Sequence, residues 1–203
     1  MNVGVLMLAD RWPLATHHDV RDELLTAYGS DGRSYHDLRH LTEVLDRLAD
    51  LGCDDLSVLL AAWFHDAVYE GSAGDEERSA AWAERALPRS LTAEVARLVR
   101  LTESHRPDDD PAGQALCDAD LAILASEPDR YAEYAVDVRR EYAHVADADF
   151  ARGRAAVLSD LLAKPALFQT PRGHELWEEA ARANVAAELA RLEGTSSSGP
   201  TPG

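Results

Sequence analysis

The sequence predicts an all-α protein, a compact helical bundle of about eight or nine helices. Apolar residues recur at the helical spacing of three and four through most of the chain. Pro88, Pro128 and Pro171 fall between the periodic stretches, where helices end or begin. No stretch shows the alternation of β-branched or aromatic residues with polar ones that a half-buried strand requires.

The first two helices that we expect differ in their burial. Residues 37–50 repeat leucine and valine at helical spacing, with charged residues between them, as in an amphipathic helix. Asp54 and Asp55 then supply an N-terminal cap for a helix from Leu56 to Val68. That helix is apolar almost all round, which is typical of a central buried helix.

The rest of the chain continues the helical pattern after a loop at Gly71–Gly74. Further helices are predicted over 75–87, 91–103, 113–125, 128–146, 148–163 and 172–193. We expect a single domain over residues 1–193. The last ten residues, 194–203, read GTSSSGPTPG and predict a disordered tail, because Ser, Gly and Pro cannot pack a core.

Composition excludes several classes of protein. The 203 residues carry 20 Lys and Arg against 37 Asp and Glu, a formal net charge of −17. This disfavours a protein that grips duplex nucleic acid through its phosphates, but a small anionic substrate is compatible with it. Cys53 and Cys117 are isolated, which implies neither a disulfide framework nor a cysteine zinc site. Without a signal peptide or a membrane-length apolar stretch, we expect a cytoplasmic protein that does not enter membranes.

Three separate groups of His and Asp interrupt the apolar pattern. In the first, His36 and His40 are four residues apart and would share one helix face. In the second, His65 and Asp66 are adjacent at the end of the most hydrophobic helix. Burying an ionised aspartate there costs several kcal/mol unless a cation or a hydrogen-bond network compensates it.

The third group is Asp118 and Asp120, again within an apolar helix. Three buried groups of His and Asp, with no basic residue inside the second and third, indicate a shared metal ion. Imidazole with carboxylate suits Mn, Fe, Co, Ni or Zn, and suits Mg less well. The sequence has no GxxxxGK[ST] phosphate loop, no HExxH and no GxSxG elbow.

The order of these groups, His40, then His65-Asp66, then Asp120, resembles the H…HD…D signature of the HD-domain metal-dependent phosphohydrolase superfamily. The resemblance covers roughly residues 10–190. Within the superfamily, the chain is similar to a bacterial family of predicted HD phosphohydrolases. The resemblance rests on the stretches RSYHDLRHLTEVL, LAAWFHDAVY, DEERSA, CDADLAIL, RREYAHV and GRAAVL.

The resemblance implies a helical bundle whose core holds one or two divalent metal ions. The implied ligands are His40, His65, Asp66 and Asp120. His36 and His105 correspond to extra histidines that hold a second ion or touch the phosphate in some members. The nucleotidase branch has a glutamate three residues after the HD aspartate, where this chain has Tyr69. The nearest acids are Glu70 and Glu76, which leaves the general base open, and Glu70 is counted among the catalytic candidates.

Arginines beside these histidines are candidates for phosphate contacts through forked hydrogen bonds. We assign a catalytic role to Arg39, and substrate contacts to Arg33, Arg106 and Tyr35.

The sequence thus predicts a metal-dependent phosphohydrolase that cleaves a phosphate ester of a small metabolite, such as a nucleotide, by a metal-activated water. Two alternatives stay open. One is a non-catalytic metal-bearing module that binds a nucleotide or a partner, and the other is a di-iron oxygenase on the same fold. A homodimer is compatible with the sequence, although no feature establishes one.

Overall fold

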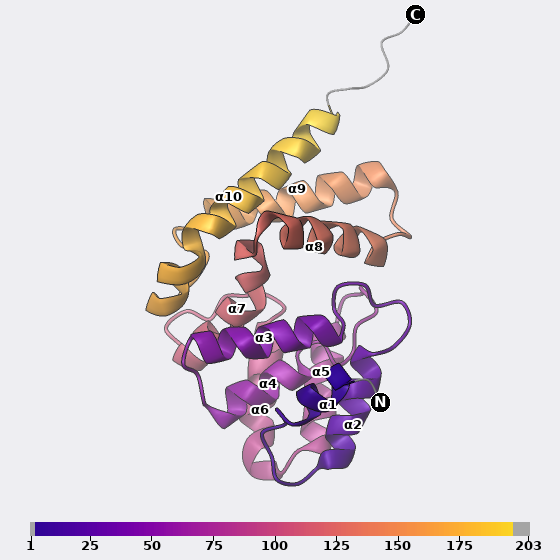
Figure 1. The fold of residues 1–203 in the computed structure, drawn as a ribbon, viewed down its shortest axis with the longest axis vertical. Coiled ribbons are helices and arrows are strands. Elements are labelled where there is room, and N and C mark those ends of the chain that lie inside the picture. Colours follow the sequence, from indigo (N-terminus) through magenta and orange to yellow (C-terminus); the bar gives the residue numbers. More distant parts are fainter. Residues whose placement is uncertain (1–2, 197–203) are drawn as a thin grey trace, which may run out of the picture. The chain divides into compact units, whose positions relative to one another are not determined.

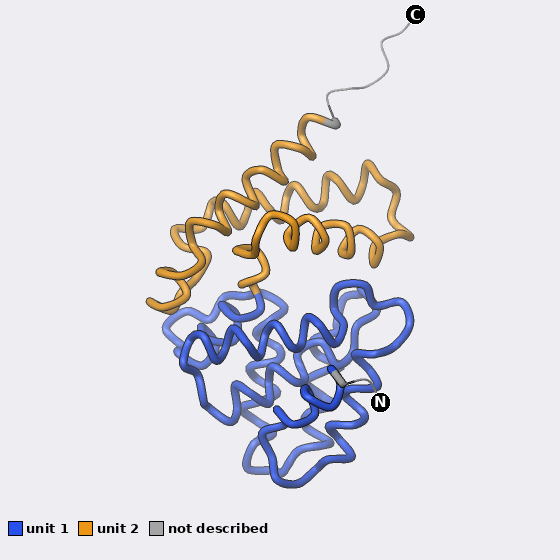
Figure 2. The backbone as a smooth tube through the Cα atoms, in the orientation of Figure 1, with its two compact units in different colours: residues 1–120 blue, residues 121–203 orange. Residues whose placement is uncertain are grey.

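The computed structural model describes residues 3–196 and contains, in that range, ten α-helices, one short 3₁₀ helix and no strand (Figure 1). The all-α prediction is therefore confirmed. The chain divides into two compact units, unit 1 with residues 1–120 and unit 2 with residues 121–203 (Figure 2). The single domain predicted over residues 1–193 stays a prediction. Among the helices that the structure describes, none combines the length and the apolar character needed to cross a bilayer.

Unit 1 carries all the residues singled out by the sequence as candidate site residues. Its helices are α1 (Val3–Ala9), α2 (His18–Tyr28), α3 (Leu38–Asp50), α4 (Leu56–Phe64), α5 (Asp75–Ala86), α6 (Arg89–Leu101) and α7 (Pro111–Leu121), the last of which ends at the boundary between the units. Unit 2 consists of η1 (Ala122–Ala125), α8 (Pro128–Glu141), α9 (Asp147–Ala163) and α10 (Pro171–Ser196).

Helix α4 forms the centre of the unit 1 core, as its all-round apolar sequence predicts. Every residue from Leu60 to Phe64 is fully buried, and α4 packs against α3, α5 and α6. Asp55 caps its start, because the carboxylate accepts hydrogen bonds from the backbone N–H groups of Ser57 and Val58 at 2.8 and 3.3 Å. The predicted cap at Asp55 is confirmed.

The end of α4 differs from the prediction, since the helix stops at Phe64 rather than at Val68. The backbone N–H of Val68 donates to the hydroxyl of Ser79 on α5, at 2.9 Å, instead of to a helix carbonyl. His65 is the C-cap, and its backbone N–H still donates to the Ala61 carbonyl at 2.8 Å, so Asp66 is the first residue beyond the helix and its cap.

The start of α3 corrects the expected position of His36. Asp37 is the N-cap, and its carboxylate accepts from the backbone N–H groups of Arg39 and His40 at 2.8 and 3.2 Å. His36 thus precedes the helix and does not share a helix face with His40, because an aspartate that caps a helix lies outside it. His40 lies on the buried stripe of α3 beside Leu41 and Val44.

Helix α7 is held close to the loop that follows α6. A Cβ atom on Gly113 would lie 2.5 Å from Leu101 Cδ2 and 2.7 Å from Asp110 Oδ2, so a larger residue here would have to displace these two side chains. The buried face of α7 includes Asp118, and Asp120 lies near its C-terminal end.

Other boundaries also differ from the sequence-based ones. Helices α1 and α2 were not predicted, although Val20, Leu24 and Tyr28 form a buried helical stripe on α2. Helix α8 ends at Glu141 rather than at residue 146, and α10 continues to Ser196 through the first residues of the expected tail. Residues 197–203 of that tail lie outside the described residues.

Unit 2 is assembled on its last helix, since α10 packs against η1 and α9. The side-chain amide of Asn184 on α10 donates to the carbonyls of Leu124 and Ser126 at 2.9 and 2.8 Å, which anchors η1. Glu188, also on α10, accepts from Arg154 at 2.9 Å and from the Tyr131 hydroxyl at 2.6 Å. The buried carboxylate of Glu188 is therefore paired with the guanidinium of Arg154, and both residues belong to unit 2.

Candidate metal centre

Two histidines meet in the interior of unit 1. His40 comes from α3 and His65 from the C-terminal cap of α4, and each is 1% exposed. Their Nε2 atoms lie 3.0 Å apart. Nδ1 of His65 lies 2.8 Å from the carbonyl of Ala62, and because a carbonyl only accepts, Nδ1 carries the proton in that bond. This bond leaves Nε2, which faces His40, as the ring nitrogen that would bind a metal ion once its own proton is lost.

Two carboxylates complete this cluster. Asp66 Oδ2 lies 3.2 Å from His40 Nε2 and 3.0 Å from His65 Nε2. Asp120 Oδ1 lies 3.2 and 3.6 Å from the same two nitrogens. The donor atoms of His40, His65 and Asp120 all lie within 4.8 Å of one another, and this buried group could hold a metal ion. We call the four residues the His–Asp cluster.

The spacing of His40, His65 and Asp120 fits a metal ion, and Asp66 is a further carboxylate beside the two imidazoles. Nitrogen and oxygen ligands lie about 2.0–2.2 Å from a transition metal, which places neighbouring donors roughly 3 Å apart in a six-coordinate shell. Four of the five donor separations above are 3.0–3.2 Å. Imidazole and carboxylate donors suit the transition metals from Mn to Zn.

The pKa values of the histidines and aspartates in the cluster depend strongly on one another. Burial favours neutral carboxyls, but the charge of His65 and the hydrogen bonds from the imidazoles outweigh it and hold the pKa values of Asp66 and Asp120 well below their usual range. Burial likewise opposes protonation of His40, but Asp120 and Asp66 outweigh it and raise its pKa to about 9. The two carboxylates therefore demand positive charge in a site that contains no Lys or Arg partner for them among the described residues.

His105 fixes the second oxygen of Asp120. It follows α6 in the left-handed backbone region, with φ 48°, and its Nε2 lies 2.8 Å from Asp120 Oδ2. An ionised carboxylate only accepts, so His105 donates this bond. The contact leaves Oδ1 directed at the two imidazole nitrogens, as an outer partner of a metal ligand would.

His36 and two tyrosines border the cluster. The His36 ring stacks on Tyr69, with centroids 4.0 Å apart, and its centroid lies 5.5 Å from that of His40. Its charge contributes to the lowered pKa of Asp66. Tyr35 is 5% exposed and its ring centroid lies 4.7 Å from that of His40, so it packs against the His40 ring.

Arg33 lies beside the cluster with its guanidinium on backbone carbonyls. Nη1 donates to the carbonyls of His36 and Asp66 at 2.9 and 2.7 Å, and Nη2 donates to that of Ala67 at 2.9 Å. Tyr28, which the sequence analysis missed, receives the backbone N–H of Asp66 on its hydroxyl at 3.2 Å. Its position on the buried stripe of α2 is the signal that could have drawn attention to it.

The structure does not bring three of the predicted site residues into the His–Asp cluster. Glu70 is exposed and pairs with Arg78 at 2.9 Å. Arg39 is exposed and pairs with Glu43, four residues on, at 3.0 Å. Arg106 is exposed and follows His105 directly.

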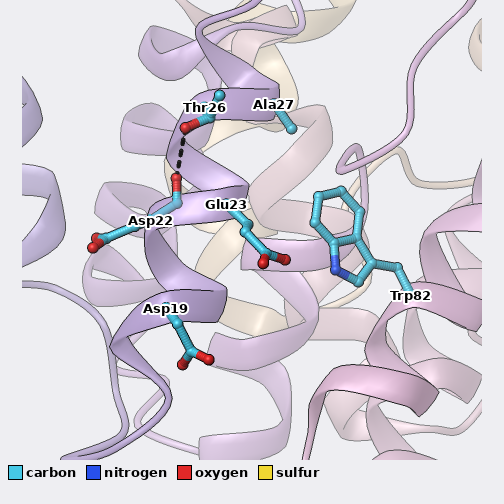
Figure 3. Close-up of a pocket in the computed structure, with 6 residues that line it drawn as sticks. All are labelled: Asp19, Asp22, Glu23, Thr26, Ala27 and Trp82. Atoms are coloured by element: carbon cyan, nitrogen blue, oxygen red, sulfur yellow. Dashed lines mark hydrogen bonds between the residues drawn. The ribbon is translucent and has the colours of Figure 1, made fainter.

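A separate open groove of about 560 Å³ lies between α2 and Trp82 of α5. Figure 3 shows the residues that line it. Its lining residues are Asp19, Asp22, Glu23, Thr26, Ala27 and Trp82. The Thr26 hydroxyl donates to the Asp22 carbonyl at 2.8 Å, a bond internal to α2. The groove contains no member of the His–Asp cluster, and acidic side chains on an open surface do not by themselves make a site.

Comparisons of the chain with protein-family models, with curated proteins and with solved structures give no match.

Proposed function

We propose that the chain is a metal-dependent phosphohydrolase of the HD-domain superfamily that cleaves a phosphate ester of a small metabolite such as a nucleotide. One observation supports this most directly. Two buried imidazole Nε2 atoms lie 3.0 Å apart, with carboxylate oxygens of two aspartates within 3.0–3.6 Å of them. Apolar side chains would stabilise the core more effectively if the role were only structural, because burying charged groups carries a large desolvation free energy.

In this proposal His40, His65, Asp66 and Asp120 hold one or two divalent ions of Mn, Fe, Co, Ni or Zn, with Mg less suited to two imidazole ligands. When bound, such an ion supplies Lewis acidity toward a phosphoryl oxygen and lowers the pKa of water. The formal net charge of −17 makes a local positive centre necessary for any anionic substrate.

The chain's own residues then have separate tasks. His105 keeps the Asp120 carboxylate oriented through its 2.8 Å hydrogen bond. His36, stacked on Tyr69 at the border of the cluster, is the imidazole that carries a proton to the leaving oxygen. The exposed guanidinium of Arg106, next to His105, binds phosphate oxygens.

The test of the site is the metal content of the full chain, measured by elemental analysis after purification without chelators. We compare the native chain with the double variant His65→Ala/Asp66→Ala. His174→Ala is the matched control, because His174 is an exposed histidine of unit 2 that lies 3.5 Å from Glu178. We expect about one or two ions per native and control chain and none in the double variant.

The hydrolysis screen follows with the metal that the analysis finds. Release of phosphate from a phosphorylated metabolite by the native and His174→Ala chains, and none by the double variant, is the expected result. A native chain that binds no metal even after incubation with Mn, Co, Ni and Fe would contradict the proposal. A metal-loaded chain that binds nucleotides without turnover would favour the binding-module alternative.

A further inference from the structure

Asp66 differs from the other members of the His–Asp cluster in its backbone surroundings. It follows the C-cap of α4, and its own backbone N–H donates to a side chain instead of to a helix carbonyl. Its N–H donates to the hydroxyl of Tyr28 at 3.2 Å, and its carbonyl accepts from Arg33 Nη1 at 2.7 Å. Both backbone polar groups of this residue are therefore held by side chains from α2 and from the segment that follows it.

Arg33 connects two segments that carry cluster residues. The same Nη1 that binds the Asp66 carbonyl also donates to the carbonyl of His36, and Nη2 donates to the carbonyl of Ala67. One guanidinium thus joins the segment leading into α3, which bears His40, to the turn after α4, which bears Asp66. The planar fork of arginine makes several such bonds at once, whereas the point charge of lysine does not.

The environment of this guanidinium indicates a specific positioning task. Its central carbon lies 5.1 Å from the ring centroid of Tyr28 and 5.8 Å from that of Tyr69, within range of cation–π attraction. No carboxylate lies within 4.0 Å of it among the described residues, although the chain is rich in acids. Its Nε is buried without a hydrogen-bond partner, a cost that the three carbonyl contacts offset.

Tyr28 adds a neutral contact on the other side of Asp66. The residue is fully buried, and its hydroxyl accepts the backbone N–H of Asp66 at 3.2 Å. The hydroxyl orients the Asp66 backbone without adding charge to the cluster.

We propose that Tyr28 and Arg33 are positioning residues that together hold Asp66 in the geometry of a metal ligand, an inference that rests on the proposed metal centre. Arg33 then acts on the backbone of the site and not on substrate phosphate. Outer partners of this kind typically contribute about 10- to 100-fold to metal affinity, because ligands held in place lose less freedom on binding.

The test uses the full metal-free chain titrated with Co²⁺, with affinity and visible absorption as readouts. Tyr28→Phe removes only the hydroxyl, and Arg33→Lys keeps the charge but loses the fork. We expect each variant to bind Co²⁺ about 10- to 100-fold more weakly than the native chain. We also expect a changed absorption spectrum of the bound ion, which a merely structural role would not produce.

Two controls separate positioning from stability. Tyr131→Phe removes a buried tyrosine hydroxyl in unit 2, where it donates to Glu188. Arg47→Lys alters an exposed arginine of α3 that pairs with Asp50 at 2.7 Å. Both should keep native Co²⁺ affinity, even where the melting temperature falls.

Native Co²⁺ affinity and spectrum in both Tyr28→Phe and Arg33→Lys, with only a lower melting temperature, would overturn the inference while leaving the metal centre intact. A native chain that takes up no Co²⁺ would contradict the metal centre, and this inference with it. Because Tyr28→Phe is nearly isosteric, the test does not depend on whether Arg33→Lys folds.

Discussion

The two units bury charged groups in opposite ways. In unit 2, Glu188 and Arg154 form an ion pair at 2.9 Å, and the Tyr131 hydroxyl completes the set. In unit 1, Asp66 and Asp120 face two imidazoles, with no Lys or Arg among their described ion-pair partners. The unit 2 set is neutral by itself, whereas the unit 1 cluster becomes neutral only by binding protons or a cation.

If the proposed metal centre is correct, this difference separates a structural arrangement from a functional one. A buried pair with its own counter-charge holds helices together and needs nothing further. An array of buried carboxylates and imidazoles needs added positive charge, either from protons on the imidazoles or from a bound cation. Substitutions in the two places should therefore change different observables.

The largest effect is expected from His40→Ala in the unit 1 cluster. Loss of a direct ligand should lower Co²⁺ affinity by more than the roughly 100-fold that loss of an outer partner causes. Isothermal titration of the metal-free chain measures this, with Arg47→Lys on the same helix as the control. Unchanged affinity in His40→Ala would remove this residue from the ligand set.

The matching change in unit 2 is Glu188→Ala, which should lower the free energy of unfolding by about 3–5 kcal/mol, because it leaves a buried guanidinium unpaired. Urea unfolding measures this cost, and Glu175→Ala, at an exposed glutamate paired with Arg172, serves as the control. Metal content should not change. Loss of metal from Glu188→Ala would show that the two units do not keep their roles apart.

Two glycines sharpen the comparison at the level of packing. Gly113→Ala on α7 forces a Cβ to within 2.5 Å of Leu101 Cδ2 and should destabilise the chain by about 1–3 kcal/mol. Gly153→Ala on α9 meets nothing within 4 Å and should stabilise it by up to about 1 kcal/mol through helix propensity. Thermal unfolding of both variants measures whether the melting temperature falls in Gly113→Ala and rises in Gly153→Ala. A change in the same direction in both variants would contradict the close approach at α7.

The smallest effect concerns pH. Burial favours the neutral form of Glu188, but Arg154 and Tyr131 outweigh it and hold its pKa below the ordinary 4.5. Since the native pKa is the lower one, this contribution is present above pH 4.5 and is lost as the pH falls toward the native value. The difference in urea midpoint between the native chain and Glu188→Gln should therefore shrink from pH 6 to pH 4. A constant difference would show that the ion pair does not titrate in this range.

The sequence was sufficient for the all-α class and for the approach of His40, His65 and Asp120, because polar ligand types in apolar helical runs stand out without a structure. The cap at Asp55 could likewise be predicted, because an aspartate just before an apolar helical run is a common N-cap. The same rule applied to Asp37 would have placed His36 outside α3.

What the sequence could not predict depends on contacts between distant segments. The early end of α4 depends on Ser79, eleven residues beyond Val68, which takes its backbone N–H. The contact of Arg33 with the Asp66 carbonyl joins residues 33 apart, and nothing in the local pattern distinguishes it from a phosphate-binding arginine. Tyr28 was missed for the same reason, since its acceptor role appears only when α2 packs beside the turn after α4.

The most direct test of the central claim is anomalous diffraction at the cobalt edge from crystals of the full chain grown with Co²⁺. The account predicts an anomalous peak about 2.0–2.2 Å from the Nε2 atoms of His40 and His65, with Asp120 Oδ1 also in contact. A chain that crystallises in millimolar Co²⁺ with no peak between these two imidazoles would contradict it.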